Sequence, residues 1–172
     1  MKMPAMIQSH AAPIAAALGR GDDALAGLKA LQGDLFPNGM WFNAPCLESS
    51  LSMANIVQNM LIQSWSDPAK DESGPIRIFP AIPSEWKDIE FRDLRTEGAF
   101  LVSASRRNGV TEWVRIKSLA GEPCLVLTDI KGEVRAKGGR SFKLEKAAPG
   151  TYRIDLQKGE EVVLCSVSAK DP

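Results

Sequence analysis

Apolar residues recur every three or four positions in the first third of the chain, a spacing that predicts helices. The segment Asp22–Gln32 places three leucines on one helical face: Leu25, Leu28 and Leu31. Either Asp22 or Asp23 could cap the N-terminus of this helix with its carboxylate. Upstream, the alanine-rich stretch Pro13–Leu18, with proline in the first turn, predicts a second helix that ends at Gly19. The two predicted helices would form a helical hairpin.

A third helix is predicted from Ser50 to Ser64, with Ser49 or Ser50 as its N-cap. Its apolar positions keep helical spacing: Leu51, Ala54, Val57, Met60 and Leu61. The preceding stretch, DLFPNGMWFNAPCLE, contains prolines and glycine that favour an irregular loop. Glu48 closes this loop and is therefore expected at, or just before, the helix N-terminus.

From Ile76 onward the period changes to two, which predicts strands. The runs around Leu101 and Val114 alternate apolar and polar residues, and Asn108-Gly109 between them predicts a type I′ hairpin. Further short runs are separated by glycine or proline: CLVLTD, GEVRA, SFKLEK, TYRIDL and EEVVLCSV. Close spacing of this kind is typical of an antiparallel sandwich, here expected from Ile76 to Val167 with about eight strands.

The predicted fold class is α+β, in three parts: helical hairpins in residues 1–70, a proline-rich joint in residues 71–90 and an antiparallel β-sandwich in residues 91–172. Three helices with an apolar stripe each cannot bury every stripe against one another, so the helical part is expected to belong to a larger helical assembly. Within the joint, Trp86 and the segment Pro80–Pro83 are expected to be buried between the helical and β parts.

Charge and hydropathy exclude several partners. The 21 basic and 21 acidic residues cancel and interleave, so the sequence offers no basic stripe that would neutralise nucleic-acid phosphates. Apolar runs are shorter than the roughly 20 residues that cross a bilayer, so no membrane contact is expected. The first twenty residues have polar and proline interruptions where a signal peptide needs an unbroken apolar region. The sequence therefore does not indicate the cellular compartment of the protein.

Neither a metal nor a cofactor is predicted. The three cysteines, Cys46, Cys124 and Cys165, have no CxxC spacing, which argues against a zinc site and a disulfide framework. Cys124 and Cys165 lie in strand-like runs and are expected to be buried thiols. His10, the single histidine, has no acid or cysteine at a useful spacing and is given no catalytic role.

Several short motifs in fixed order resemble the C-terminal part of the fucosidase-type glycoside hydrolases of family 95. These motifs are MLIQS at Met60–Ser64, IRIFPA at Ile76–Ala81, WKD at Trp86–Asp88 and GAF at Gly98–Phe100. The resemblance runs from about Gly19 to Cys124, and an ordered set of motifs is more specific than any one of them. It implies that the helices belong to an (α/α) toroid that holds the active site, followed by a small β domain.

The resemblance also implies inverting hydrolysis of a glycosidic bond in an oligosaccharide or polysaccharide, of the α-L-fucosidase or α-L-galactosidase type. Such enzymes place a general acid and a water-activating carboxylate about 6.5–9.5 Å apart. The family's proton donor lies upstream of this chain, so the chain alone is expected to be inactive. It is expected to pack against the N-terminal helical domain of a longer, exported protein.

Counted back from MLIQS, Glu48 falls where the family has the aspartate of a Phe-Gln-Ile-Asp-Gly-Asn-Phe-Gly motif, on the water-activating side. The chain reads PCLESSLS there, so the carboxylate is one methylene longer. Trp41 could stack on a sugar ring, and Asn43 is a candidate substrate contact. Each has a structural alternative, since helix N-termini favour acids and aromatic residues in loops often pack on a core.

A second hypothesis is that the strands after Ile76 form a non-catalytic accessory or carbohydrate-binding module. Such a module usually presents several aromatic side chains on its sheet. After Phe91 the sequence offers four scattered ones: Phe100, Trp113, Phe142 and Tyr152. The glycosidase hypothesis therefore fits the sequence better.

Overall fold

The computed structural model describes residues 5–32, 47–66 and 74–167; the side chains of residues 5–10 and 47–50 are not among those described. The chain divides into two compact units. A helical unit comprises Met1–Gln63 and Phe79–Glu85, and a β unit comprises Ser64–Ile78 and Trp86–Pro172. The joint predicted in residues 71–90 is thus shared between the two units.

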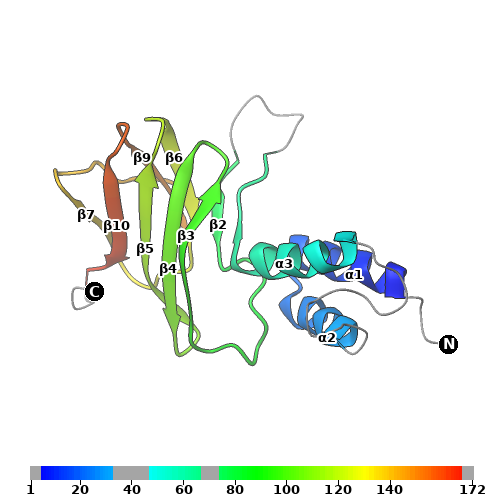
Figure 1. Ribbon diagram of the computed structural model, residues 1–172. Helices are drawn as coiled ribbons and strands as arrows, with labels where there is room; N and C mark the ends of the chain where they lie inside the picture. The colour runs from blue at the N-terminus through cyan, green and yellow to red at the C-terminus, as the bar shows by residue number, and fades with distance from the viewer. Residues whose placement is uncertain (1–4, 33–46, 67–73, 168–172) are drawn as a thin grey trace. The chain divides into compact units, whose positions relative to one another are not determined.

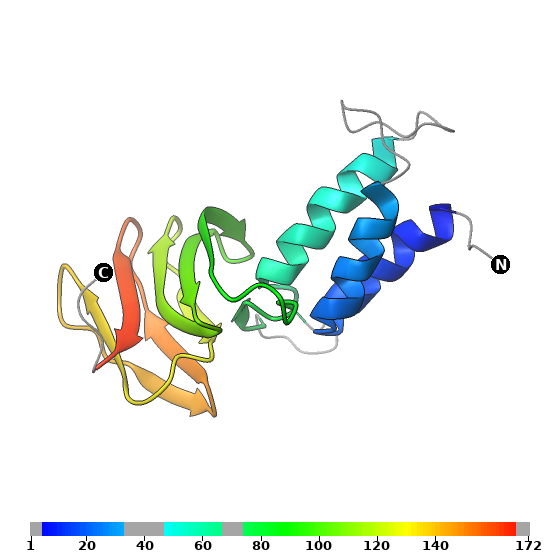
Figure 2. The same cartoon turned by 90° about the horizontal axis from the view of Figure 1, so that it is seen from below.

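The helical unit contains α1 (Ala5–Ala17), α2 (Gly21–Gln32), α3 (Leu47–Leu61) and the two-residue β1 (Ile62–Gln63). Helix α1 packs against both other helices (Figure 2). Alanine and glycine allow close contact, because a Cβ added to Gly27 of α2 would lie 2.6 Å from the Cβ of Ala12 in α1. The predicted α2 is confirmed to within one residue, although its helix begins before both candidate N-cap aspartates.

Helix α1 is longer than predicted, because it begins at Ala5 and contains Pro13 in its interior. The prediction that Pro13 stands in the first turn is wrong. An internal proline costs the helix one hydrogen bond and about 3 kcal/mol relative to alanine. Ala12 and Ala16 on either side are 2% and 0% exposed, so packing within the unit offsets that local cost.

The turn between α1 and α2 confirms the predicted helical hairpin. Gly19 has a φ of 74°, the left-handed conformation that glycine adopts without strain. The N–H of Gly19 donates to the Ala16 carbonyl at 3.0 Å, and the N–H of Arg20 donates to the Ala15 carbonyl at 2.8 Å. This pair of bonds is a Schellman motif, which ends α1 and directs the chain into α2.

The predicted bounds of α3 are wrong at both ends. The helix begins at Leu47, three residues before the predicted Ser50, and ends at Leu61 rather than Ser64. Its last carbonyls bond to a distant segment: the N–H of Phe79 donates to Leu61 at 2.8 Å, and that of Ala81 donates to Met60 at 3.3 Å. Phe79–Glu85, here called the capping segment, therefore satisfies carbonyls that a helix end leaves without partners.

The capping segment also contacts the start of α2. A Cβ on Gly21 would lie 2.5 Å from the Ala81 carbonyl oxygen, so no larger residue fits without a shift of backbone. The Asp22 carboxylate accepts hydrogen bonds from both the N–H and the hydroxyl of Ser84, at 2.7 and 3.0 Å. Phe79 itself has a φ of 54°, a costly conformation for an aromatic residue.

The β unit contains two antiparallel-rich sheets, consistent with the predicted sandwich (Figure 1). One sheet has the order β3-β4-β5-β10-β7, and strands of the other follow the order β2-β6-β9-β8. The strands are β2 (Ile76–Ile78), β3 (Ile89–Thr96), β4 (Phe100–Arg107), β5 (Val110–Ser118), β6 (Pro123–Leu127), β7 (Val134–Gly138), β8 (Glu145–Ala148), β9 (Thr151–Asp155) and β10 (Glu161–Ser166). The β2–β6 pair is parallel, a departure from the all-antiparallel prediction. Among the described residues after Phe91 the regular elements are strands.

Register places fully buried apolar side chains of the first sheet on one face. Val102, Ile116 and Val162 lie opposite one another on β4, β5 and β10, and each is 0% exposed. The β4–β5 hairpin turns at Asn108 and Gly109, with φ values of 49° and 75°. Two successive positive φ values confirm the predicted type I′ turn.

Burial is uneven within the predicted joint, and its predicted burial between the helical and β parts stays a prediction. Pro83 is fully buried and Ala81 is 1% exposed, whereas Pro80 and Trp86 are half-buried. Pro83 belongs to the helical unit and Trp86 to the β unit.

Candidate functional site

Glu48, the predicted catalytic carboxylate, is the second residue of α3. It therefore lies within the first turn, where free N–H groups and the helix dipole favour a negative charge. Trp41 and Asn43, the predicted substrate contacts, lie outside the described residues, as does Cys46. The roles assigned to Glu48, Trp41 and Asn43 stay predictions.

The opposite end of α3 carries the MLIQS motif, and its residues make specific contacts. Met60 is 0% exposed in the core of the helical unit. Gln63 is 4% exposed, and its side-chain amide donates to the carbonyls of Ala16 at 2.8 Å and Asn59 at 2.9 Å. Ser64 belongs to the β unit, where its hydroxyl accepts the N–H of Glu97 at 3.0 Å.

The β3–β4 turn holds the GAF motif in a strained conformation. Gly98 and Ala99 both have positive φ, 75° and 58°, which allows Thr96 to pair with Phe100. The Glu97 carboxylate in this turn accepts the Ser66 hydroxyl at 3.0 Å, and that hydroxyl also accepts the N–H of Gly74 at 3.0 Å. These bonds join three separate segments of the β unit.

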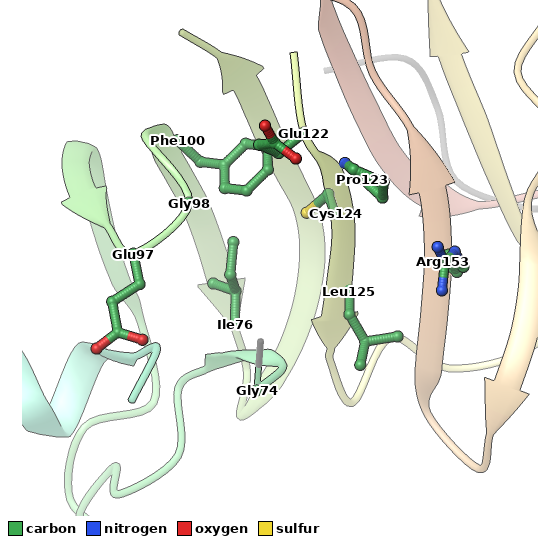
Figure 3. Close-up of a pocket in the computed structure, with 10 residues that line it drawn as sticks. All are labelled: Gly74, Ile76, Glu97, Gly98, Phe100, Glu122, Pro123, Cys124, Leu125 and Arg153. Carbon is green, nitrogen blue, oxygen red and sulfur yellow. The ribbon is translucent and has the colours of Figure 1, made fainter. Parts of the chain in front are cut away.

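A pocket of about 410 Å³ lies beside this turn in the β unit (Figure 3). The residues that line it are Gly74, Ile76, Glu97, Gly98, Phe100, Glu122, Pro123, Cys124, Leu125 and Arg153. Ile76, Phe100 and Cys124 are at most 3% exposed, so the pocket reaches the sandwich core. Glu97, Glu122 and Arg153 are exposed and add charge. Sequence reasoning missed this pocket, because its residues come from β2, β6, β9 and the β3–β4 turn and share no local motif.

The pocket offers no reactive thiol. Burial raises the pKa of Cys124 to about 12, so this side chain stays protonated at neutral pH. Cys124 and Cys165 are both buried and free, as the sequence predicted. Cys124 therefore contributes volume and apolar contact to the wall of the pocket.

A second polar cluster lies where the β4–β5 hairpin meets the loop after β6. Asp129 accepts hydrogen bonds from the Thr111 hydroxyl and from Arg106, the latter at 2.7 Å. Burial would raise the pKa of Asp129, but the bonds from Thr111 and Arg106 outweigh it and hold that pKa below its ordinary value. The Asp129 carboxylate is therefore ionised at neutral pH and links a strand to a loop.

Within the described ranges, the structure gathers no group of three or more histidine, cysteine or carboxylate side chains that could hold a metal ion. Nor does any helix in these ranges have the length and hydropathy to cross a membrane. His10 lies in α1, and its side chain is not among those described.

Comparison with known families decides the assignment. Residues 71–164, more than half of the chain, match glycoside hydrolase family 95, C-terminal domain. The chain belongs to glycoside hydrolase family 95. This result confirms the resemblance drawn from the motifs, of which IRIFPA, WKD and GAF lie inside the matched residues and MLIQS lies before them. No curated protein matches the chain.

Proposed function

We propose that this chain is the C-terminal part of an inverting glycosidase of the α-L-fucosidase or α-L-galactosidase type. Its helices complete an (α/α) toroid with helices that precede them in a longer protein. The observation that carries the proposal is the position of Glu48 in the first turn of α3, together with membership of glycoside hydrolase family 95.

Exposed apolar side chains on the helices support packing against further helices. Ile14 of α1 and Leu18, which directly follows α1, are 59% and 67% exposed, and Leu51 of α3 is 67% exposed. Alanines 11, 12 and 15 and Gly27 line a depression of about 450 Å³ beside Ile14 and Leu18. Small residues of this kind allow another helix to approach closely.

In the proposed mechanism, a general acid from the preceding part of the protein protonates the leaving oxygen. The Glu48 carboxylate removes a proton from a water molecule, which attacks the anomeric carbon from the opposite face and inverts its configuration. Trp41 and Asn43 contact the sugar. The chain by itself lacks the acid, which is commonly worth about 10²–10⁴-fold in rate, and so has no glycosidase turnover.

The test compares the 172-residue chain with the complete reading frame that contains it, on aryl α-L-fucosides and α-L-galactosides. We expect activity in the longer protein, inverted stereochemistry in the product by NMR, and none in the short chain. Glu48→Gln in the longer protein should lower kcat strongly while its thermal melting temperature stays unchanged. Turnover by the short chain would contradict the proposal that the general acid lies in the preceding part of the protein. Full activity of Glu48→Gln would show that Glu48 has no catalytic role and only stabilises the helix N-terminus.

A carbohydrate-binding role for the β unit is the second candidate. The pocket beside the β3–β4 turn favours it, because exposed carboxylates and a guanidinium can bond sugar hydroxyls. Isothermal titration of the chain with fucose, galactose and their oligosaccharides tests this role. Binding that Glu122→Gln abolishes would support it; equal heats from wild type and variant would exclude the pocket.

A further inference from the structure

Gln63 connects two helices through a single buried side chain. Its amide nitrogen donates to Ala16 in the last turns of α1 and to Asn59 in the last turn of α3, at 2.8 and 2.9 Å. A primary amide has two N–H groups, so both of its hydrogens are used. Because Gln63 is only 4% exposed, water cannot readily replace either of the carbonyls that it bonds.

The accepting carbonyls lie where the helices end. The Ala16 oxygen also accepts the N–H of Gly19 in the Schellman turn, so the bond from Gln63 uses its second lone pair. On α3, the next two carbonyls, Met60 and Leu61, accept N–H groups of the capping segment. Three consecutive carbonyls of α3 thus accept hydrogen bonds from residues outside the helix. Of the residues that donate these bonds, Gln63 also bonds α1 and so connects the two helices.

We propose that Gln63 is a positioning residue, which fixes the rotation and axial register of α3 against α1 and thereby places Glu48 for catalysis. This inference rests on the proposed function of Glu48. The two residues lie at opposite ends of α3, about 20 Å apart at 1.5 Å per helical residue. A continuous helix transmits a small rotation or shift along its whole length, and misplacement of a catalytic group by about 1 Å can cost about 10²-fold in rate.

The test uses the longer protein and three variants. Gln63→Met keeps the length of the side chain and removes both donors. Gln63→Glu replaces the amide with a carboxylate that, when ionised, faces carbonyl oxygens with no hydrogen to donate. Gln58→Met is the matched control, because Gln58 is an exposed glutamine of α3, five residues before Gln63.

For Gln63→Met we expect kcat to fall about ten- to hundredfold, with KM changed less than about threefold. Amide hydrogen exchange should become faster in the last turns of α1 and α3. Gln63→Glu should regain part of its kcat relative to wild type as the pH falls and its carboxyl group becomes protonated, since one donor is then restored. Gln58→Met should match wild type in all of these measurements.

The outcomes separate this inference from the proposed function. If Glu48→Gln inactivates the enzyme but Gln63→Met keeps the wild-type kcat, the positioning role is overturned while the catalytic role of Glu48 stands. If Gln63→Met speeds exchange without changing kcat, Gln63 only stabilises the fold, and the inference fails equally. If Glu48→Gln keeps full activity, the proposed function fails first and the inference fails with it.

Discussion

The two units treat their apolar side chains differently. In the β unit, side chains from the centre of the first sheet, such as Val114, Ile116 and Leu164, are 0% exposed, so the sandwich buries its own core. In the helical unit, Ile14, Leu18 and Leu51 are each more than half exposed. The strands thus bury a core of their own, whereas the helices leave an apolar surface that the proposed larger helical assembly would cover.

Alanine substitutions at two leucines, one in each unit, should differ most in their effect on stability. Leu164→Ala should lower the free energy of unfolding by about 2–5 kcal/mol, because it removes buried methyl groups and leaves a cavity. Leu51→Ala should change it by no more than about 0.5 kcal/mol in this chain, since Leu51 is 67% exposed. Urea titration of both variants measures the difference. In the longer protein, a Leu51→Ala cost that stays near zero would contradict coverage of α3 by further helices.

The next effect concerns the close approach of the capping segment to α2. Gly21→Ala should destabilise the helical unit by about 1–3 kcal/mol, because the new Cβ would lie 2.5 Å from the Ala81 carbonyl oxygen. In an unobstructed helix the same change would stabilise. Gly139→Ala is the control in the β unit, where the added Cβ meets nothing within 4 Å. Gly21→Ala should therefore melt at a lower temperature than Gly139→Ala. Equal melting temperatures would show that the capping segment can shift away from the new Cβ at little cost.

A smaller and opposite effect is expected in the β3–β4 turn. Ala99 has a φ of 58°, which costs an alanine about 1 kcal/mol and a glycine almost nothing. Ala99→Gly should therefore raise the free energy of unfolding by about 0.5–1 kcal/mol, less the extra entropy that glycine has in the unfolded chain. Chemical denaturation measures the gain. A loss of stability would mean that the methyl group of Ala99 makes contacts worth more than the strain.

The smallest effect is a pH dependence from Asp129. Its pKa in the folded chain lies below the ordinary 3.8, so its contribution is complete above that value and is lost as the pH falls through the folded pKa. Asp129→Asn should cost at most about 1 kcal/mol at pH 7, because the side chain is 42% exposed and screened by solvent. The cost should shrink as the pH falls below 3.8 and through the folded pKa. A cost that does not change with pH would assign it to packing rather than to charge.

Local pattern was sufficient where an element depends on its own residues. The leucine stripe predicted α2 almost to its ends, and Asn108-Gly109 predicted the type I′ turn, because only residues that tolerate positive φ fit there. The ordered motifs predicted the family, which the match over residues 71–164 confirms. Glu48 was placed at the start of α3 on the same basis, and its catalytic role stays a prediction.

What sequence reasoning missed depends on contacts between distant segments. Helix α1 continues through Pro13 because Ala12 and Ala16 are packed, and α3 ends at Leu61 because Phe79 and Ala81 cap its carbonyls. The pocket in the β unit exists only once β2, β6 and β9 lie side by side. The sequence alone thus determined the family, the α+β class and the elements with strong local signals. Helix ends, the double contact of Gln63 and the pocket were decided by tertiary structure, because hydrogen-bond partners and packing neighbours far apart in the chain meet only in the fold.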